Sequence, residues 1–513
     1  MQKEAVAGSV ETHWRPSHNP WLICAAVMLA TTIEVLDTTI TNVAMPNIAG
    51  NLAVTTHEAT WVLTSYLVAN AIILPAAAWF SGFFGRKRFL ISCIVLFTIA
   101  SLLCGFANSL GFLLLARVFQ GLGGGALMPI SQAILFESFP KEKHGVAMAV
   151  FAVGVIVAPI LGPIIGGWLT DNYSWRWVFF INLPIGIIAV LMAKAFIEDP
   201  PYIKKEKSMI DYIGFGLMAV GLGSLQIVLD KGQEVDWFQS AWLCKMAILT
   251  CISLIAFIFW ELRVKHPVVN LRILKDRNFC AGLIAAMLIG ASMYGIMTLM
   301  PLFYQTLLGY SAYLSGIASA SLGIGAFASA IAVGILTKRI DSRIFFVLGL
   351  LILGAACFYM AGINLQIAIF SMLIPLIAIG FGISTAFVPL SLLAVGHLAN
   401  KDMGNGSGLF NLMRNIGGSI GIAMTTTMLS RMSQVHQTFL VGHLTPYDQV
   451  YRQTSQSMGK GIGDGLVYRG LLQQSALLAY VDSFYLFSIM AILCILTVFL
   501  FRKVKVDGAI AVH

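Results

Sequence analysis

The sequence predicts an all-α polytopic membrane protein, and three observations support this prediction. Hydrophobic residues make up 58% of the 513 residues, and the mean hydropathy is +0.85. Charged residues make up only 11%. Fourteen apolar stretches are long enough to cross a bilayer as helices. A water-soluble domain could not bury this much apolar surface, so most of it must face lipid or other membrane helices.

The fourteen expected spans follow one another with mostly short connections. They cover 21–43, 58–82, 89–107, 110–136, 143–170, 175–197, 211–230, 240–261, 279–307, 312–336, 343–362, 366–396, 403–432 and 477–501. Two six-helix bundles with an extra pair between them account for this number, as in transporters built from parallel repeats. A faint repeat agrees, because a tight basic turn follows both the second span, at Gly85–Arg88, and the tenth span, at Lys338–Arg343.

This division predicts five regions. They are an N-terminal tail at 1–20, an N-terminal six-helix bundle at 21–197, an extra helix pair at 211–261, a C-terminal six-helix bundle at 279–501 and a C-terminal tail at 502–513. The N-terminal tail has no apolar core followed by a cleavage site, so we expect the first span to act as its own insertion signal. The eight cysteines lie in or beside apolar stretches without metal-ligand spacing, and we expect neither disulfides nor a metal site.

The basic residues indicate the orientation in the membrane. Most Lys and Arg lie in the loops that follow the even-numbered spans and in the C-terminal tail, whereas the alternate loops carry few. By the positive-inside rule, both termini are expected in the cytoplasm. The net charge of +9 is scattered over these loops and is not gathered on one surface, which argues against a nucleic-acid partner.

The segment 433–476 is the longest connection between expected spans. It is polar, rich in Gln and Ser, and interrupted by glycines. One interpretation is a solvated loop on the external side. The other is a helical hairpin that docks a partner, with 447–458 and 466–478 as its short helices.

Glu34 and Asp37 are two acids inside the first span, about one turn apart on the same helical face. A carboxylate at membrane depth costs about 2.5–3.5 kcal/mol on insertion scales, so a helix that keeps two is expected to use them. A carboxyl group can bind a proton on one side of the membrane and release it on the other, which predicts proton or cation coupling. The structural alternative is that Asp37 holds the helices together by hydrogen bonds to Thr or Asn neighbours.

Arg117 and Arg414 are the cations deepest in the expected spans, and each should have a partner or face a cavity. Arg414 would be a counter-charge if it lay opposite Glu34 or Asp37. The structural alternative for Arg117 is a tie to backbone carbonyls. For the uncharged polar residues in spans, the sequence favours interhelical contacts over ligand contacts; these residues are Asn70, Gln132, Asn182 and Gln226.

Glycine and proline are concentrated in two spans. Gly121 and the run 123–125 are expected to break the fourth span. The fifth span contains a dense block of Pro159, Gly162, Pro163, Gly166 and Gly167. Two prolines within five residues should distort the helix, and the glycines let helices approach closely. We interpret this block as part of the gating machinery.

Several segments resemble signatures of the fourteen-span drug:proton antiporters of the major facilitator superfamily. They are Leu36–Pro46, Arg117–Gly123, Ala158–Gly167, Trp175–Gly186 and Asn411–Gly418. A further segment, Gly223–Gly232 followed by Asp236–Phe238, is similar to EmrB-type exporters in particular. The resemblance extends over about residues 20–500.

The resemblance implies the major facilitator fold and an exporter in the bacterial cytoplasmic (inner) membrane. Such an exporter moves hydrophobic or amphipathic drugs in exchange for protons and needs no cofactor beyond the proton gradient. It also implies a periplasmic membrane-fusion adaptor and an outer-membrane channel as partners, for which 433–476 would be the contact. In the family, Asp37 is the constant acid and Arg117 modulates its proton affinity, which leaves Glu34 to couple protons or to meet a cationic substrate.

The resemblance also assigns gating to the basic turn of Gly85, Arg86 and Lys87. The chain departs from the family at Gly82, where the turn usually carries an acid that helps to latch the cytoplasmic gate. The latch is therefore either absent or formed by another residue.

Other functions stay open at this point. An exporter of one metabolite or siderophore would use the same motifs. A channel or receptor without coupled transport is disfavoured, because it needs neither the paired acids nor the Pro/Gly block. An enzyme is the least favoured alternative, because the sequence contains no Ser/His/Asp set, metal-spaced His/Cys cluster or phosphate-binding loop.

Overall fold

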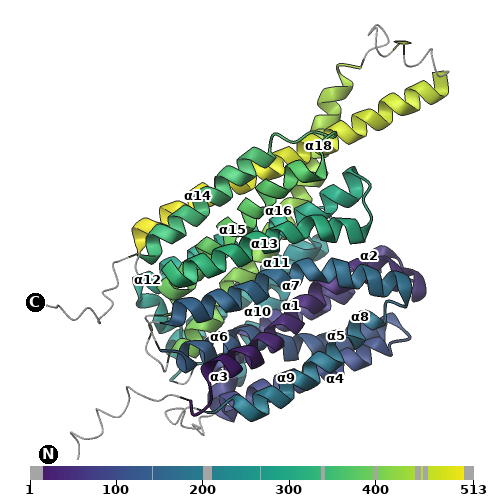
Figure 1. Ribbon diagram of the computed structural model, residues 1–513. Helices are drawn as coiled ribbons and strands as arrows, with labels where there is room; N and C mark the ends of the chain where they lie inside the picture. Colours follow the sequence, from purple (N-terminus) through teal and green to yellow (C-terminus); the bar gives the residue numbers. More distant parts are fainter. Residues whose placement is uncertain are drawn as a thin grey trace, which may run out of the picture.

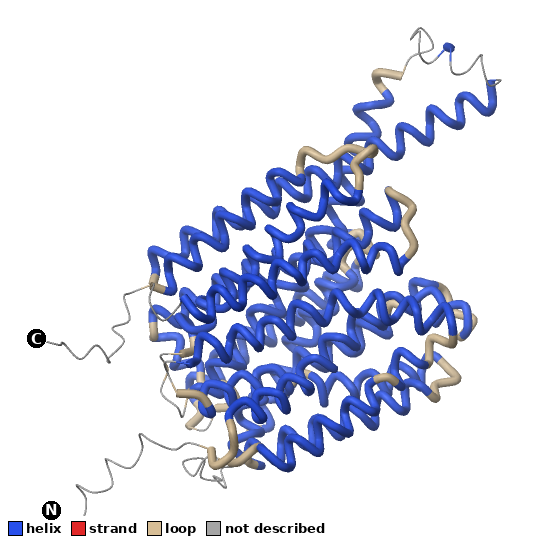
Figure 2. Tube along the Cα trace, viewed as in Figure 1, coloured by secondary structure: helices blue, strands red, loops and turns tan. Residues whose placement is uncertain are grey.

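Long helices lying side by side form most of the described part of the protein (Figure 1). The computed structural model describes residues 16–140, 143–199, 211–265, 267–336, 341–396, 398, 402–444, 452–453 and 460–501. Within these residues there are helices and loops and no strand (Figure 2). Helices are expected here, because backbone groups in lipid must be hydrogen-bonded within their own segment.

The first nine helices form the N-terminal half. They are α1 (Pro20–Asn51), α2 (Thr56–Ala59), α3 (Trp61–Phe84), α4 (Arg86–Gly105), α5 (Leu110–Gly124), α6 (Leu127–Ser138), α7 (His144–Asn172), α8 (Trp177–Phe180) and α9 (Asn182–Phe196). The expected glycine break in the fourth span is confirmed, because α5 ends at Gly124 and α6 begins at Leu127.

The extra pair and the C-terminal half follow. The pair is α10 (Tyr212–Lys231) and α11 (Ala241–Arg263), joined through a 3-10 turn at Trp237–Gln239. After a 3-10 turn at Leu271–Lys275, the C-terminal half contains α12 (Arg277–Leu302) with a π-helical turn at Phe303–Leu307, α13 (Ala312–Leu336), α14 (Ser342–Met360), α15 (Ile369–Ala394), α16 (Met403–Val441) and α18 (Lys460–Ile495) with a 3-10 turn at Leu496–Leu500.

The two halves repeat one packing pattern. In the N-terminal half, α1 packs on α7, α5 lies between α3 and α4, and α9 packs on α4 and α1. In the C-terminal half, α12 packs on α16, α15 lies between α13 and α14, and α18 packs on α14 and α12. The halves meet where α13 lies along α7 and where α16 lies along α3. In the repeat, α13 corresponds to α3 and α16 to α7, so these two contacts are equivalent. The extra pair packs through α10 against α3 and α16, and thus touches both halves.

Twelve helical segments of the described residues are long and apolar enough to cross a membrane. The two other expected spans, 143–170 and 403–432, coincide with α7 and α16. Every expected range therefore coincides with helix, while the number of fourteen spans stays a prediction.

The first and last described residues lie at the same end of the bundle (Figure 1). Helices α16 and α18 both extend beyond the bundle at the other end, which we call the distal end (Figure 1). The segment 433–476 is thus helical to Val441 and again from Lys460, so the spans that border it are longer than expected. Most of the expected helix 447–458, and both predicted tails apart from 16–20, lie outside the described residues.

Glycine allows the central helices to touch backbone to backbone. A Cβ atom at Gly417 or Gly421 of α16 would collide with the carbonyl oxygens of Met287 and Ala291 on α12. Small residues at such contacts favour close helix association in membranes. This packing fixes how α16 is rotated about its own axis, and thus where its residue Arg414 lies.

Candidate functional site

Asp37 lies in a fully buried ion pair inside the N-terminal half. Its Oδ2 is 2.5 Å from Nη1 of Arg117, and neither side chain has exposed surface. Its Oδ1 accepts hydrogen bonds from Gln120 and Asn182, both at 2.8 Å. Gln120 and Asn182 also donate to Ser101, at 2.6 and 3.1 Å. We call these five residues the ion-pair cluster; it joins α1, α4, α5 and α9.

Arg117 makes both kinds of contact that the sequence left open. It pairs with Asp37, and its Nε also donates to the backbone carbonyl of Val62 at 3.1 Å. Its guanidinium lies over the ring of Tyr66, 4.4 Å from the ring centre. Since Arg117 has a charge, a carbonyl and an aromatic face as partners, its position is fixed from three sides.

Glu34 is one turn from Asp37 on α1 but has different neighbours. Its Oε1 accepts a hydrogen bond from Asn70 at 2.9 Å, and its Oε2 has no hydrogen-bond partner among the described residues. The residue is only 6% exposed. A buried carboxyl oxygen without a donor is costly when charged, so Glu34 is a candidate for binding a proton or a cation.

Glu34 belongs to a second polar group, at the contact between the two halves. Asn415 of α16 lies 3.5 Å from Oδ1 of Asn70, and Arg414 lies 3.3 Å from Oδ1 of Asn415. Asn411 of α16 donates to Gln132 of α6 at 2.7 Å. We call this group the interface cluster: Glu34, Asn70, Gln132, Asn411, Arg414 and Asn415. It links α1, α3 and α6 of one half to α16 of the other.

Arg414 is 1% exposed, and its Nε and Nη1 have no hydrogen-bond partner among the described residues. It is near enough to Glu34 for its charge to act on that carboxylate. The sequence allowed Arg414 to face either acid. In the structure Arg117 forms the ion pair with Asp37, while Arg414 acts on Glu34 through its charge and forms no ion pair with it.

The Pro/Gly block brings α7 against α1 next to these acids. A Cβ atom at Gly162 would collide with Thr39, and one at Gly166 would lie 3.1–3.2 Å from Ile40. Gly167 is buried and Pro163 is half-buried. Pro159 lies in the same helix, and its side chain is outside the described set. The block therefore sets the α1–α7 distance at the level of Asp37.

The basic turn is held by two acids that sequence reasoning missed. Arg86 forms a largely buried ion pair with Glu137 at the end of α6. The backbone N–H of Lys87 donates to Asp199 at 2.8 Å. Gly85 makes the turn with φ +89°, a conformation that glycine adopts without strain. At Gly82, where the family has an acid, a Cβ atom would meet nothing within 4 Å.

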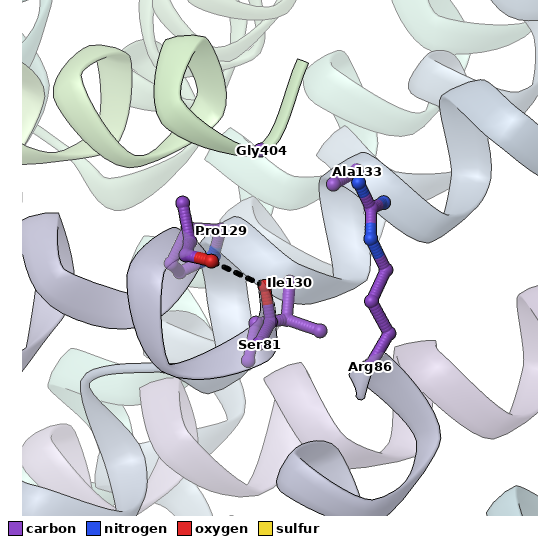
Figure 3. Close-up of a pocket in the computed structure, with 7 residues that line it drawn as sticks. Ser81, Arg86, Pro129, Ile130, Ala133 and Gly404 are labelled. Carbon is purple, nitrogen blue, oxygen red and sulfur yellow. Dashed lines mark hydrogen bonds between the residues drawn. The ribbon is translucent and has the colours of Figure 1, made fainter. Parts of the chain in front are cut away.

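A small cavity lies beside this turn. Figure 3 shows the Arg86 side chain extended toward Ala133 of α6, with Ser81 of α3 and Gly404 of α16 lining the same space. Its volume of about 10 Å³ is the space of one water molecule. This cavity is too small for an organic substrate. The interface cluster is the candidate site because it holds an acid with an oxygen that no described residue binds, at the contact between the two halves.

The remaining members of both clusters carried weaker signals in the sequence. Asn70, Gln132 and Asn182 do make the interhelical contacts that the sequence favours. Gln120 was missed, although it follows Arg117 by one helical turn and shares its partner. Asn415 was missed because its neighbour Arg414 is the more conspicuous residue.

The chain is similar to known exporters over most of its length. The sequence profile of the Major Facilitator Superfamily matches residues 27–422. The "Fatty acid resistance protein FarB" of Neisseria gonorrhoeae is 36% identical over 92% of this chain and 94% of its own. The "Multidrug export protein EmrB" of Haemophilus influenzae is 35% identical over 88% and 89%, and that of Escherichia coli K12 is 36% identical over 86% of each chain.

Solved structures share the fold at low sequence identity. The human organic anion transporter MFSD10 (TETRAN) superposes with a TM-score of 0.60 at 12% identity, over 94% of this chain and 100% of that one. A bacterial homologue of the human lysosomal transporter Spinster, in an inward-facing and unoccupied conformation, gives 0.55 at 15% identity, over 95% and 99%. These two likenesses concern the arrangement of the helices.

Proposed function

This chain belongs to the Major Facilitator Superfamily, and we propose that it exports hydrophobic or amphipathic toxic compounds in exchange for protons. Relatives named as multidrug export proteins, similar over most of the chain, support the export of drugs. One observation supports proton coupling above all others. The Glu34 carboxyl is buried where the two halves meet, with one oxygen that no described residue binds.

Glu34 is the better proton carrier of the two acids. Asp37 already receives three donors, and one of them is the charged Arg117. A proton on Asp37 would leave Arg117 buried without its counter-charge, a loss of about 3–5 kcal/mol. A proton on Glu34 breaks no ion pair and can occupy the oxygen that lacks a donor. In this mechanism Glu34 carries the proton, and Asp37 is a positioning residue that holds α1 against α5 and α9.

Exchange follows from competition for the Glu34 carboxyl. The charge of a proton and that of a monovalent organic cation are equal, so either can neutralise Glu34 while Arg414 keeps its own charge. The interface cluster then has the same net charge with proton or drug bound, and only the empty state differs. Both halves contribute residues to the cluster. The presence of a proton or a drug there can therefore bias the motion of one half relative to the other.

We propose an orientation in the bacterial inner membrane with the distal end facing the periplasm. The basic residues of the loops that follow even-numbered spans support this orientation. The Arg86 turn then faces the cytoplasm, and the extended parts of α16 and α18 project away from it. The resemblance to EmrB-type pumps and this projection together suggest a periplasmic adaptor, acting with an outer-membrane channel, as the partner.

The projecting helices carry apolar side chains that the bundle does not cover. Phe439 of α16 is 67% exposed and Ile462 of α18 is 69% exposed. The two helices are joined near the bundle by His436 and Asp482, whose Nε2 and Oδ2 are 2.6 Å apart. Replacing residues 440–477 by a short Gly/Ser loop should leave transport in proteoliposomes intact and abolish drug resistance of cells. Loss of both, or of neither, would contradict the adaptor proposal.

Proton coupling can be tested in proteoliposomes with ethidium as the cationic probe. For the unaltered protein, ethidium transport should follow an imposed pH gradient, and ethidium should release protons from an acidified lumen. Glu34→Gln should lose both effects, because the neutral amide still accepts from Asn70 but can neither bind a proton nor neutralise a cation. Glu261→Gln, a buried acid of α11 away from the interface cluster, is the matched control and should behave like the unaltered protein. Gradient-driven transport by Glu34→Gln would overturn the assignment.

A further inference from the structure

We propose that the distal end of α10 is a clasp across the two halves, which must release α16 before substrate can leave. The clasp consists of residues Gln226–Trp237. It rests on the proposed export function and adds the element that controls the outer exit. Contacts to both halves and an unusual backbone conformation support the proposal.

The clasp is anchored firmly on the N-terminal half. Lys231 is 3% exposed, donates to Thr60, and lies over the ring of Trp61 at 5.1 Å. Its neighbour Asp230 accepts a hydrogen bond from Thr64. Buried charged groups held by several partners are costly to release, so this side of the clasp should stay on α3.

The contacts on the C-terminal half involve no buried charged group. Gln226 exchanges hydrogen bonds with Ser419 at 2.9 and 3.0 Å, and the indole of Trp237 donates to Thr427 at 3.2 Å. Asp236 pairs with Arg431 at 3.2 Å, with the two side chains 62% and 54% exposed. Exposed pairs of this kind contribute little, so this side is the one that can open and close.

The turn that reaches α16 has an uncommon backbone. Asp236 and Trp237 are consecutive residues with φ of 58° and 54°, in the left-handed region that bulky residues rarely adopt. The Trp237 N–H donates to the Gly232 carbonyl at 2.7 Å, and a Cβ at Gly232 would lie 2.7 Å from the Trp237 ring. Backbone of this kind persists only where surrounding contacts hold it, which favours a turn that changes its conformation in use.

The position of the clasp explains what it would control. It spans the distal part of the contact between α3 and α16, and the interface cluster lies deeper in the same contact. Separation of the halves at the distal end would pull α16 away from α3. Since α10 is fixed on α3, the contacts of Gln226, Asp236 and Trp237 with α16 must break in that motion.

Reversible cross-linking tests the clasp. The pair D236C and R431C would be introduced into a variant in which the native cysteines are replaced by Ser or Ala, and joined by a short bifunctional methanethiosulfonate. We expect cross-linking to slow gradient-driven ethidium transport at least tenfold, and dithiothreitol to restore it. The control pair H436C and D482C joins α16 to α18 within one half, and its cross-link should change the rate less than twofold.

The outcomes separate the clasp from the proposed function. If the D236C and R431C protein transports ethidium equally well with and without the cross-link, the clasp is wrong while proton-coupled export stands. If the same protein, free of cross-linker, shows no gradient-driven transport although the cysteine-replaced background does, the contact matters for more than opening, and the clasp as described is wrong. If the cysteine-replaced background and the unaltered protein also show no such transport, it is the proposed function that fails.

A second measurement does not depend on transport. Trp237→Ala removes the contact with Thr427 and should favour opening at the distal end. A membrane-impermeant maleimide should then label S419C from the outside at least fivefold faster. Phe238→Ala alters the next residue of the same turn, which is 64% exposed, and should leave labelling unchanged. Equal labelling in both variants would overturn the clasp.

Discussion

Arg117 and Asp37 form an ion pair in which neither side chain is exposed to any degree, and Nη1 of the guanidinium is 2.5 Å from Oδ2 of the carboxylate. Breaking such a pair leaves one uncompensated charge in a low-dielectric interior. The pair joins α1 to α5, so its loss should affect the stability of the whole N-terminal half.

Asp37→Asn and Arg117→Gln should therefore each lower the free energy of unfolding by about 3–5 kcal/mol. The double variant should lose less than the sum, because it leaves no unpaired charge. Thermal unfolding in detergent, followed by tryptophan fluorescence, measures this coupling. Normal stability of Asp37→Asn, together with loss of proton release, would instead make Asp37 the proton carrier.

Asn182→Ala should cost about 1–3 kcal/mol, because one donor to a buried carboxylate is lost without replacement. The comparison is Asn172→Ala on the exposed end of α7, where the side chain donates to the carbonyl of Trp168. That variant should unfold within about 0.5 kcal/mol of the unaltered protein. Similar losses for both would mean that Asn182 acts through packing and not through its bond to Asp37.

Gly162→Ala should destabilise the protein by about 1–3 kcal/mol, because the added methyl group pushes α7 away from Thr39 and Ile40 on α1. Gly82→Ala is the matched control, since nothing lies within 4 Å of a Cβ at that position. It should be neutral, or stabilising by up to about 1 kcal/mol through helix propensity. Unfolding midpoints of the two variants decide the matter, and the reverse order would refute close α1–α7 packing.

Arg86→Glu should sharply reduce the yield of folded protein, because it places two acids together in a largely buried site with Glu137. Adding Glu137→Arg should recover a measurable part of that yield. Size-exclusion chromatography of detergent-solubilised protein gives the folded fraction. No recovery in the double variant would show that the turn needs the arginine at position 86 and the acid at position 137, and that opposite charges at these positions are not sufficient.

Much of the fold could be predicted from the sequence, because lipid requires long apolar helices and leaves few alternatives. The exception was the extent of helix in 433–476. The hairpin interpretation gave a helix at 466–478, but α16 and α18 both continue as helices well beyond their apolar pattern. The length of an apolar stretch in the sequence indicates only the part of a helix that lies in lipid. Helix that stands in water is visible to this approach only through weaker propensity signals.

The site was predicted in its charges and not in its pairings. Glu34, Asp37, Arg117 and Arg414 were conspicuous because charges are rare in spans. Which arginine serves which acid depends on how α5 and α16 pack against α1, and no spacing along the chain encodes that. Glu137 and Asp199 escaped notice because acids at the ends of spans are common and carry no signal by themselves.

Helix α16 is a single rod that carries Arg414 at mid-depth and continues to Val441 outside the bundle. At 1.5 Å per residue, about 40 Å of helix separates these two residues, and a tilt of about 10° at Arg414 would move the tip by about 7 Å. Binding or release of a proton or cation at the interface cluster can in this way move the tip of α16, far from the membrane. Helix α16 then acts as a lever, with its short arm at the interface cluster and its long arm at the surface where a partner would bind.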